Sequence, residues 1–389
     1  MTLKKIYSAV LATGAICFAF SANAAAATEA QKAPTSHGSG TELVILGSAA
    51  GRTSWGGHSA GGMSAAIAVG KDRYIVDFGR GWHERYYEAG LGTSAAPTGF
   101  GGLENLRAGF ITHLHADHVI DYPRLLLFGA TEGLRKRKAP IQIFGPGNRG
   151  GLPPTSGKLT DSVDTINPEN PTPGTAELTE YLYRAFATDL NDNIHDSGMP
   201  NPNAYIKVND IQIPPAIGAS KTNTSPRMAP INVYQDENVK VTATLVSHPP
   251  MYPSFAFRFD TADGSVVFSG DTNRSENLIE LAKGADVLVH EVISTHWAEN
   301  LFPTPRTAAQ EAKLDHLIKS HTPISEVGPI AHEAGVKLLV LSHLAPPSIP
   351  DEEWLRAVKT FAGRTAIGNP LFRIKLPLQG ADASQSRKK

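Results

Sequence analysis

The sequence predicts an αββα sandwich, a fold in which two β-sheets pack face to face and helices cover both outer faces. Two observations lead to this prediction. Short apolar runs that are typical of strands occur in meandering groups, and helical segments lie between the groups. Polar residues also follow several of these runs directly, and α/β folds bring such strand ends together at one edge, where their sites are built.

The N-terminal half contains the first group of strands. A glycine-rich stretch at 47–62 lacks the G-K-[ST] sequence of a nucleotide-binding loop, so we expect a flexible loop beside the site. Around this loop we expect strands at 42–47, 63–69, 73–78, 108–112 and 141–144, and helices at 81–89 and 122–128.

The C-terminal half repeats the alternation of strands and helices. One helix begins after Ser275, a good N-cap residue, and ends at Gly284. Another begins with Pro323 in its first turn and stops at Gly335. The other expected elements are strands at 241–246, 255–259, 265–268, 286–290, 337–342 and 371–376, and a helix at 351–361.

These elements define one domain at 41–376. Within it, residues 146–236 are rich in Pro, Gly, Asn, Thr and Ser, and only 176–190 has a helical pattern. Because long structureless stretches inside a domain are usually functional or disordered, we expect an insertion that covers the site. Outside the domain we expect a signal peptide at 1–24, a linker at 25–40 and a disordered tail at 377–389.

The N-terminus has the features of an export signal. Lys4 and Lys5 precede an apolar run at 6–20, and an Ala-x-Ala cleavage site ends at Ala24. The run is short for a membrane-spanning helix, so a retained anchor is the disfavoured alternative. The only cysteine, Cys17, lies in this segment, so the mature chain has no disulfide and no cysteine nucleophile. We therefore expect a secreted or periplasmic protein without membrane attachment after cleavage.

The stretch 112–118 reads T-H-L-H-A-D-H and is the strongest functional signal. His113 and His115 alternate at the end of an apolar run, which places both imidazoles on one side of an extended chain. Asp117 and His118 follow in a turn toward the same point. Imidazole and carboxylate suit zinc and its neighbours, and burying so many polar groups is unfavourable unless a cation binds them. The alternative is a polar loop with incidental histidines.

Later strands end in residues of the same chemistry. These residues are His248, Asp271, His290 with Glu291, and His343. A single histidine at a strand end is more often structural than metal-binding. Four such positions together with the 112–118 motif instead favour one metal site at a common edge.

These segments resemble the metallo-β-lactamase superfamily, and more narrowly its branch with ribonuclease Z and the zinc-dependent arylsulfatases. The resemblance covers most of 42–376 and implies the αββα sandwich of that superfamily. The motifs that carry it are T-H-L-H-A-D-H (112–118), F-S-G-D-T (268–272), V-H-E-V (289–292), H-T-P (321–323) and L-S-H (341–343).

The resemblance implies two zinc ions, with Mn²⁺ or Fe²⁺ as alternative occupants. The implied ligands are His113, His115 and His248 for the first ion, Asp117, His118 and His343 for the second, and Asp271 as the bridge. His321 and Glu291 match positions of this branch that either surround the metal ligands or take part in catalysis.

Three residues are expected to take part in the chemistry. Two zinc ions roughly 3.5–4 Å apart can hold a bridging hydroxide at neutral pH, and Asp117 can bind one ion and orient that hydroxide. His321 can donate a proton to the leaving group or steady an anionic oxygen. Glu291 can orient His321 or a ligand histidine. The alternative for His321 is a histidine that precedes a helix and has no role.

The predicted function is an exported dizinc hydrolase that cleaves sulfate or phosphate esters in the manner of arylsulfatases. We expect a small-molecule ester as substrate, no nucleic-acid partner, and a chain compatible with a homodimer. The net charge of −1 gives no basic field, and the basic cluster at 135–138 is read as a solvated loop. The short interval 249–270 leaves no room for the tRNA-binding arm of ribonuclease Z.

Other functions stay open as alternatives. A lactonase or β-lactamase is disfavoured because S-H-P-P at 247–250 departs from their P-G-H-T-x-G-type motif. A phosphodiesterase or ribonuclease Z-like nuclease and a non-catalytic zinc protein are the others. Surface or loop positions are expected for His37, His58, His83, His195, His296, His316 and His332. An aromatic wall for an aryl group could come from Trp55, Trp82, Tyr252 or Trp297.

Overall fold

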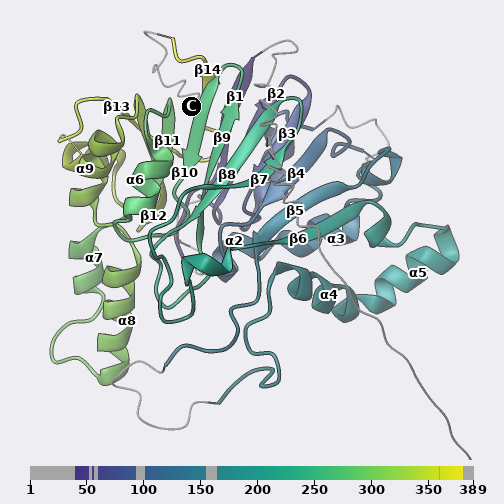
Figure 1. Cartoon of the computed structure of the whole chain (residues 1–389), viewed down its shortest axis with the longest axis horizontal. Helices are drawn as coiled ribbons and strands as arrows, with labels where there is room; N and C mark the ends of the chain where they lie inside the picture. Colours follow the sequence, from purple (N-terminus) through teal and green to yellow (C-terminus); the bar gives the residue numbers. More distant parts are fainter. Residues whose placement is uncertain are drawn as a thin grey trace, which may run out of the picture. The chain divides into compact units, whose positions relative to one another are not determined.

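Two mixed β-sheets pack face to face and helices cover their outer faces, which confirms the predicted αββα sandwich (Figure 1). The computed structural model describes residues 40–51, 55–56, 60–92, 101–154, 164–358 and 360–379. All of them belong to the unit that runs from Pro34 to Lys389. The signal peptide expected at 1–24, nearly all of the linker and the end of the tail lie outside the described residues and stay predictions.

The first sheet has the strand order β14-β1-β2-β3-β4-β5-β6. Its strands pair antiparallel from β14 to β3 and parallel from β3 to β6. They are β14 (Arg373–Leu376), β1 (Thr41–Gly47), β2 (Ser64–Val69), β3 (Asp72–Val76), β4 (Leu106–Phe110), β5 (Ile141–Pro146) and β6 (Ile206–Ile211).

The second sheet has the order β13-β12-β11-β10-β9-β8-β7. Its strands pair parallel from β13 to β10 and antiparallel from β10 to β7. They are β13 (Arg364–Ile367), β12 (Leu338–Ala345), β11 (Val287–Ile293), β10 (Gly264–Phe268), β9 (Phe255–Thr261), β8 (Val239–Leu245) and β7 (Ile231–Gln235).

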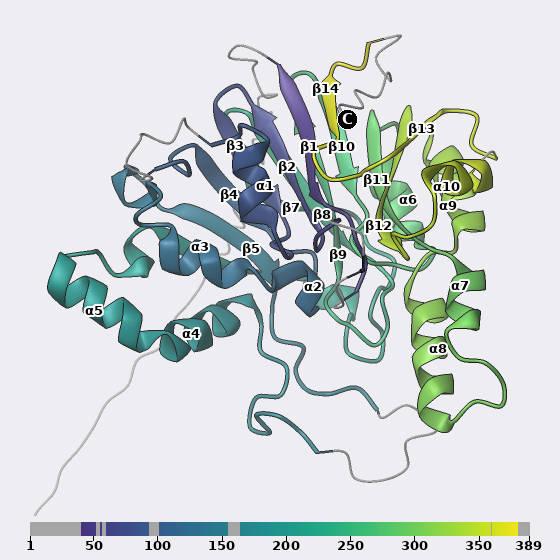
Figure 2. The same ribbon diagram turned by 180° about the vertical axis from the view of Figure 1, so that it is seen from behind.

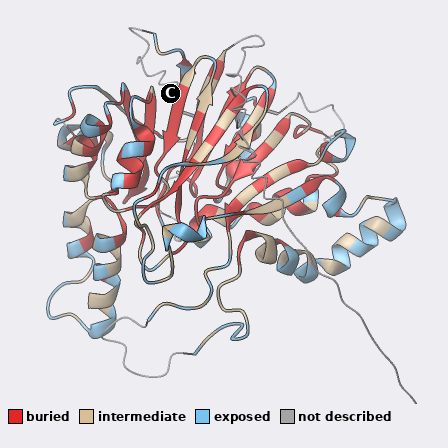
Figure 3. Cartoon of the chain, in the orientation of Figure 1, coloured by how far each residue is buried: buried red, intermediate tan, exposed pale blue. Residues whose placement is uncertain are grey.

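Apolar side chains fill the space between the layers. Neighbouring residues of a strand face opposite ways, so Leu43 and Ile45 of β1 pack between the sheets while Val44 and Leu46 pack under helices. Strands that are buried on both faces read as continuous apolar runs, which is the pattern that the sequence shows. Figure 3 shows the result, with buried strands at the centre and exposed outer faces on the helices.

The helices lie on both sides of the sheet pair. Trp82 of α1 and Leu125 of α3 pack on the first sheet, whereas Leu278 of α6, Val327 of α9 and Trp354 of α10 pack on the second (Figure 2). The helices are α1 (Trp82–Glu88), α2 (Ala116–Val119), α3 (Tyr122–Phe128), α4 (Thr175–Ala185), α5 (Ala187–Ser197), α6 (Glu276–Ala282), α7 (Thr295–Asn300), α8 (Ala308–Ser320), α9 (Ile324–Ala334) and α10 (Asp351–Ala357). In the part of the chain that is described, no helix is long and apolar enough to cross a membrane.

The described part of the segment 146–236 contains more helices and strands than the sequence predicts. Instead of one helical piece at 176–190 it forms α4 and α5, which are separated at Phe186, where φ is −103° and ψ is 20°. It also contains β6 and β7, the outermost strands of the two sheets. Because these strands are mostly only partly buried, their sequences carry no continuous apolar run, so the prediction missed them.

Helix α8 is a second element that the sequence reading missed. Thr307 and Gln310 form a capping box at its start. However, only Leu314 and Ser320 are buried along its length, so the apolar stripe that reveals an amphipathic helix is too sparse to recognise.

Candidate metal centre

Three histidine rings from two strand ends face one another. His113 and His115 follow β4, and His248 follows β8. The Nδ1 atom of His115 lies 3.1 Å from the Nε2 atoms of both His113 and His248. Zn–N bonds of roughly 2.0–2.1 Å at tetrahedral angles place ligand nitrogens roughly 3.3 Å apart. The three nitrogens therefore fit around one ion of this kind.

A second cluster contains Asp117 and His118 from α2 and His343 from β12. The Nε2 atom of His343 lies 3.2 Å from Oδ2 of Asp117, and the Nε2 atom of His118 lies 3.7 Å from the same oxygen. His343 is the extra residue where the register between β11 and β12 shifts, and its φ is 45°. A bulge of this kind re-aims a side chain, and here it accompanies the placement of His343 in the cluster.

Asp271, which follows β10, lies between the two clusters. Its Oδ2 atom is 3.6 Å from Nε2 of His113 and 3.2 Å from Nε2 of His343. Its Oδ1 atom is 3.3 Å from Nε2 of His118. A carboxylate that reaches both sets of histidines can bind two ions at once.

The buried atoms of these clusters require a cation. The Nε2 atom of His118 and the Oδ1 atom of Asp271 are buried and have no hydrogen-bond partner among the described residues. An unpaired buried polar atom costs roughly 1–3 kcal/mol. An ion in each cluster would satisfy both atoms, and imidazole with carboxylate is a donor set for zinc and related metals. Each of the two clusters is therefore a group of side chains that could hold a metal ion.

The first cluster is electrostatically prepared for a metal. Burial lowers the pKa of His113 well below its ordinary value, the pKa of His115 to about 2 and the pKa of His248 to about 3. These rings are therefore neutral, which is the form that binds metals. The Nδ1 atom of His248 donates to the carbonyl oxygen of Ser320 at 2.7 Å, which leaves Nε2 to face the cluster.

Asp77 is a functional residue that the sequence reading missed. It is buried just after β3, and its carboxylate accepts hydrogen bonds from Nδ1 of His118 (2.8 Å) and from the backbone N–H of Thr112 (2.8 Å). Burial disfavours charge on His118, but the carboxylates of Asp271, Asp77 and Asp117 outweigh it and raise the pKa of that ring. The sequence shows D-F-G at 77–79 directly after the strand, but only the fold brings Asp77 into contact with His118.

We expect Asp77→Asn to weaken metal binding at the second cluster by roughly 10–100-fold, because the carboxylate that orients His118 is lost. Competition with a chromophoric chelator measures this affinity. Asp72, a buried carboxylate at the start of the same strand that pairs with Arg107, provides the matched control. Asp72→Asn should lower stability and leave the metal affinity unchanged; equal affinities in both variants would contradict the role of Asp77.

His321 and Glu291 lie together beside the second cluster. The Nδ1 atom of His321 lies 3.1 Å from Oε1 of Glu291, and the backbone N–H of Thr272 donates to the same oxygen at 2.7 Å. The ring of His321 stacks on that of His343, with centroids 5.5 Å apart. Since Nδ1 is engaged, the Nε2 atom of His321 is the one left to meet a substrate. Their catalytic roles stay predictions.

Two histidines that were expected on the surface lie elsewhere. His83 in α1 is buried, and its Nε2 atom lies 2.6 Å from Oε2 of Glu132. His316 in α8 lies near the site, with its ring centroid 6.1 Å from that of His248. It was missed because α8 itself was missed. The others are as follows: His195, His296 and His332 are exposed as expected, and His37 and His58 lie outside the described residues.

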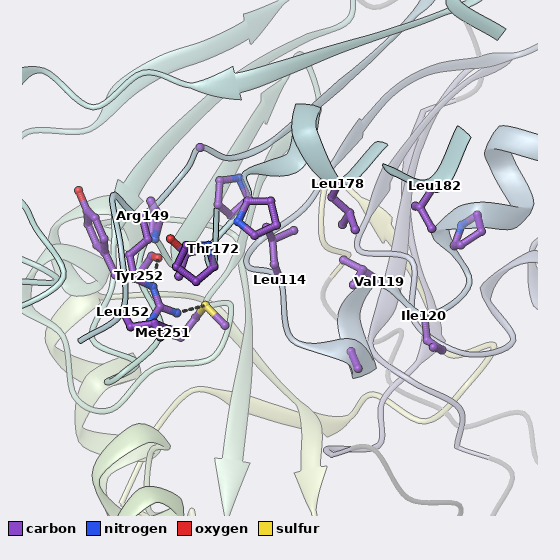
Figure 4. Close-up of a pocket in the computed structure, with 17 residues that line it drawn as sticks. Leu114, Val119, Ile120, Arg149, Leu152, Thr172, Leu178, Leu182, Met251 and Tyr252 are labelled. Carbon is purple, nitrogen blue, oxygen red and sulfur yellow. Dashed lines mark hydrogen bonds between the residues drawn. The ribbon is translucent and has the colours of Figure 1, made fainter. Parts of the chain in front are cut away.

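A cavity of about 460 Å³ is lined in part by residues that neighbour the metal ligands in the sequence (Figure 4). Leu114 and Ala116 of the metal motif line one part of it, and α4 and the loop before α4 line another. Of the four aromatic residues considered for an aryl wall, Tyr252 lines this cavity. Trp82 is buried under the first sheet, and Trp55 contacts Trp297 with ring centroids 5.7 Å apart.

Comparisons with known proteins place this site in context. No protein-family model matches the chain. Ribonuclease Z of Mycobacterium bovis (strain BCG / Pasteur 1173P2) is 27% identical over 318 residues, which are 81% of this chain and 92% of that protein. Ribonuclease Z of Mycobacterium avium (strain 104) is 28% identical over 318 residues, with the same coverage of both chains.

Solved structures agree on the fold. The metallo-β-lactamase fold protein YhfI from Bacillus subtilis has a TM-score of 0.52 at 16% identity and covers 87% of this chain and 100% of that one. The short form of human tRNase Z has a TM-score of 0.52 at 17% identity, with the same coverage. The chain therefore has the metallo-β-lactamase fold.

The comparisons correct two predictions. The main functional assignment, an arylsulfatase-like hydrolase, is wrong, because the similar proteins are ribonucleases Z and not sulfatases. The expected absence of a nucleic-acid partner is wrong for the same reason. The arguments against a nucleic-acid substrate were the expected export, the net charge and the lack of room for a tRNA-binding arm at 249–270, and none of these describes which ester the metal site can attack. Export itself stays a prediction.

Proposed function

We propose that this chain, which has the metallo-β-lactamase fold and is similar to ribonuclease Z over 318 residues, is a zinc-dependent phosphodiesterase that cleaves RNA. The observation that carries this proposal is the pair of donor clusters that share Asp271, in a chain similar to ribonuclease Z over 318 residues. Because one structural neighbour is the short form of human tRNase Z, a tRNA precursor is the first RNA to test.

The metal ligands are proposed from the geometry. His113, His115 and His248 would hold one zinc ion; Asp117, His118 and His343 would hold the other; Asp271 would contact both. Two zinc ions would supply positive charge beside the scissile phosphate and make water nucleophilic at neutral pH.

The residues around the ligands would position the reactants. Asp117 is held by the backbone N–H of Gly51, which donates to its Oδ2 atom at 2.8 Å. In the hydrolysis, water adds to phosphorus, the bond from phosphorus to one ester oxygen breaks, and that oxygen takes up a proton. His321 is the proposed donor of this proton, and Glu291 holds its ring in place.

A hydrolysis panel tests the proposal. Zinc-loaded protein would be given a 3′-extended tRNA, bis(p-nitrophenyl) phosphate and p-nitrophenyl sulfate. We expect cleavage of the RNA and of the phosphodiester, with a kcat/KM for the sulfate lower by at least about 100-fold, a difference of roughly 2.7 kcal/mol in barrier height. Asp271→Ala serves as the inactive control. Faster hydrolysis of the sulfate, or no cleavage of either phosphodiester, would refute the assignment.

A further inference from the structure

The cavity shown in Figure 4 lies beside the metal site, because Ala116 and Ile120 line both this cavity and a neighbouring one whose wall includes the metal ligand Asp117. Leu114 and Ala116, which line it, alternate in sequence with the metal ligands His113, His115 and Asp117. The other lining residues belong to α2, α3 and α4 and to the stretches 146–152, 171–173 and 251–253. Because of the wall that it shares with the cavity beside Asp117, one arm of a substrate whose phosphate contacts the ligands can reach the mouth of this cavity.

The walls of the cavity are apolar. The lining side chains are aliphatic, thioether or proline groups for the most part, including Leu114, Val119, Leu178, Leu182, Met251 and Pro253. No aspartate or glutamate is among the described residues that line it, so none of these side chains repels a phosphate. Apolar side chains, like aromatic ones, can pack against the flat faces of an unpaired base.

Arg149 provides the charged side chain among the lining residues. Its Nε atom donates to the carbonyl oxygen of Tyr252 at 3.1 Å, and its Nη2 atom lies 3.6 Å from Sδ of Met251. Both contacts are drawn in Figure 4. A guanidinium has five N–H donors, and a partly buried charge is costly unless acceptors surround it. A ligand that brings oxygen or nitrogen acceptors into the cavity would give the remaining N–H donors of Arg149 their partners.

These features favour a heterocycle over an alkyl chain. An alkyl arm would fill the apolar walls but offer no acceptor to Arg149. A nucleobase has apolar faces for the walls and carbonyl or ring-nitrogen acceptors for the guanidinium. Resting on the proposed function, we infer that the cavity holds one unpaired nucleobase of RNA next to the scissile phosphodiester, with little selection among bases.

Removal of a single base tests the inference. Two RNA substrates would carry an abasic nucleotide on one side or the other of the scissile phosphate, and a third would be intact. We expect one abasic substrate to lose about 10-fold in kcat/KM, as loss of one stacked base does at other sites. Equal kcat/KM values for all three would overturn the inference.

Two leucines of similar exposure give a matched pair of variants. Leu152 lines the cavity and is 46% exposed, whereas Leu301 at the end of α7 is not among the lining residues and is 41% exposed. Leu152→Gln and Arg149→Gln should reduce the difference between intact and abasic RNA. Leu301→Gln should keep the full difference. The same reduction in all three variants would contradict a local role of the cavity.

A binding measurement separates this inference from the proposed function. Fluorescence anisotropy of the same labelled RNAs with the metal-free full chain requires no turnover. If no RNA is cleaved but the intact strand binds about 10-fold more tightly than one abasic strand, the phosphodiesterase assignment fails and the base site stands. Equal binding, or tighter binding of a strand with an alkyl group in place of the base, would overturn the base site.

Discussion

Asp271→Ala is expected to remove both metal ions and to reduce phosphodiester hydrolysis to background. Asp271 is buried and reaches His113 and His343 through one oxygen and His118 through the other. Loss of an outer partner of a metal ligand costs roughly 10–100-fold in affinity or activity. Loss of a ligand that two ions share should exceed that cost, because the histidines of both clusters then lose their common counter-charge.

Metal content and activity, measured on the same purified sample, check this expectation. Asp271→Asn keeps the shape of the side chain and separates the loss of charge from the opening of a cavity. Asp263 is a suitable control, because it also follows a strand of the second sheet but accepts a hydrogen bond from Thr41 instead of facing the site. Asp263→Ala should retain both ions. Two bound ions with full activity in Asp271→Ala would rule out the bridging position.

Much of the site was predictable because its residues are defined locally. Each ligand directly follows, or ends, an apolar run, and apolar runs that are buried on both faces become strands of a packed sheet. His113, His248, Asp271 and His343 are separated in sequence, but all are gathered at strand ends. The metal motif and the strand pattern therefore indicated both the αββα sandwich and the donor set.

The residues that were missed depend on contacts that only the fold creates. Asp77 becomes a partner of His118 because β3 lies beside β4 in the sheet. Arg149 belongs to a segment that was read as a loose insertion, although β6 and β7 anchor that segment to both sheets. The left-handed backbone of His343 has no signature in the sequence.

The error in substrate class has a physical basis. Two metal ions respond to charge that develops on the reacting centre, and sulfate and phosphate esters share that feature. The ligand motif therefore fits either ester. Discrimination depends on the groups beside the metals, and we propose that the cavity lined by Arg149 is one of them; the sequence did not reveal this cavity.

His321→Ala is expected to slow turnover by about 10²–10⁴-fold while both metal ions stay bound. The Nδ1 atom of His321 contacts Glu291 and lies 4.0 Å from Oδ2 of Asp271. Neither donor cluster around Asp271 includes His321, so removing the ring leaves all of these ligands in place. If the ring protonates the leaving oxygen, its loss should matter most for esters whose leaving group is a strong base. The steepness of the rate against leaving-group pKa, measured with a series of aryl phosphodiesters, should increase in the variant.

This dependence distinguishes proton donation from a structural role. If the ring only supports His343 by stacking, its removal would slow the hydrolysis of all esters by the same factor. Its removal would then also lower the metal affinity. Glu291→Gln should give a smaller defect of the same kind, because the ring remains but is held less firmly. His332→Ala, on the exposed side of α9, should change neither rate nor metal content. Unchanged turnover of an ester with a poor leaving group in His321→Ala would remove His321 from the reaction.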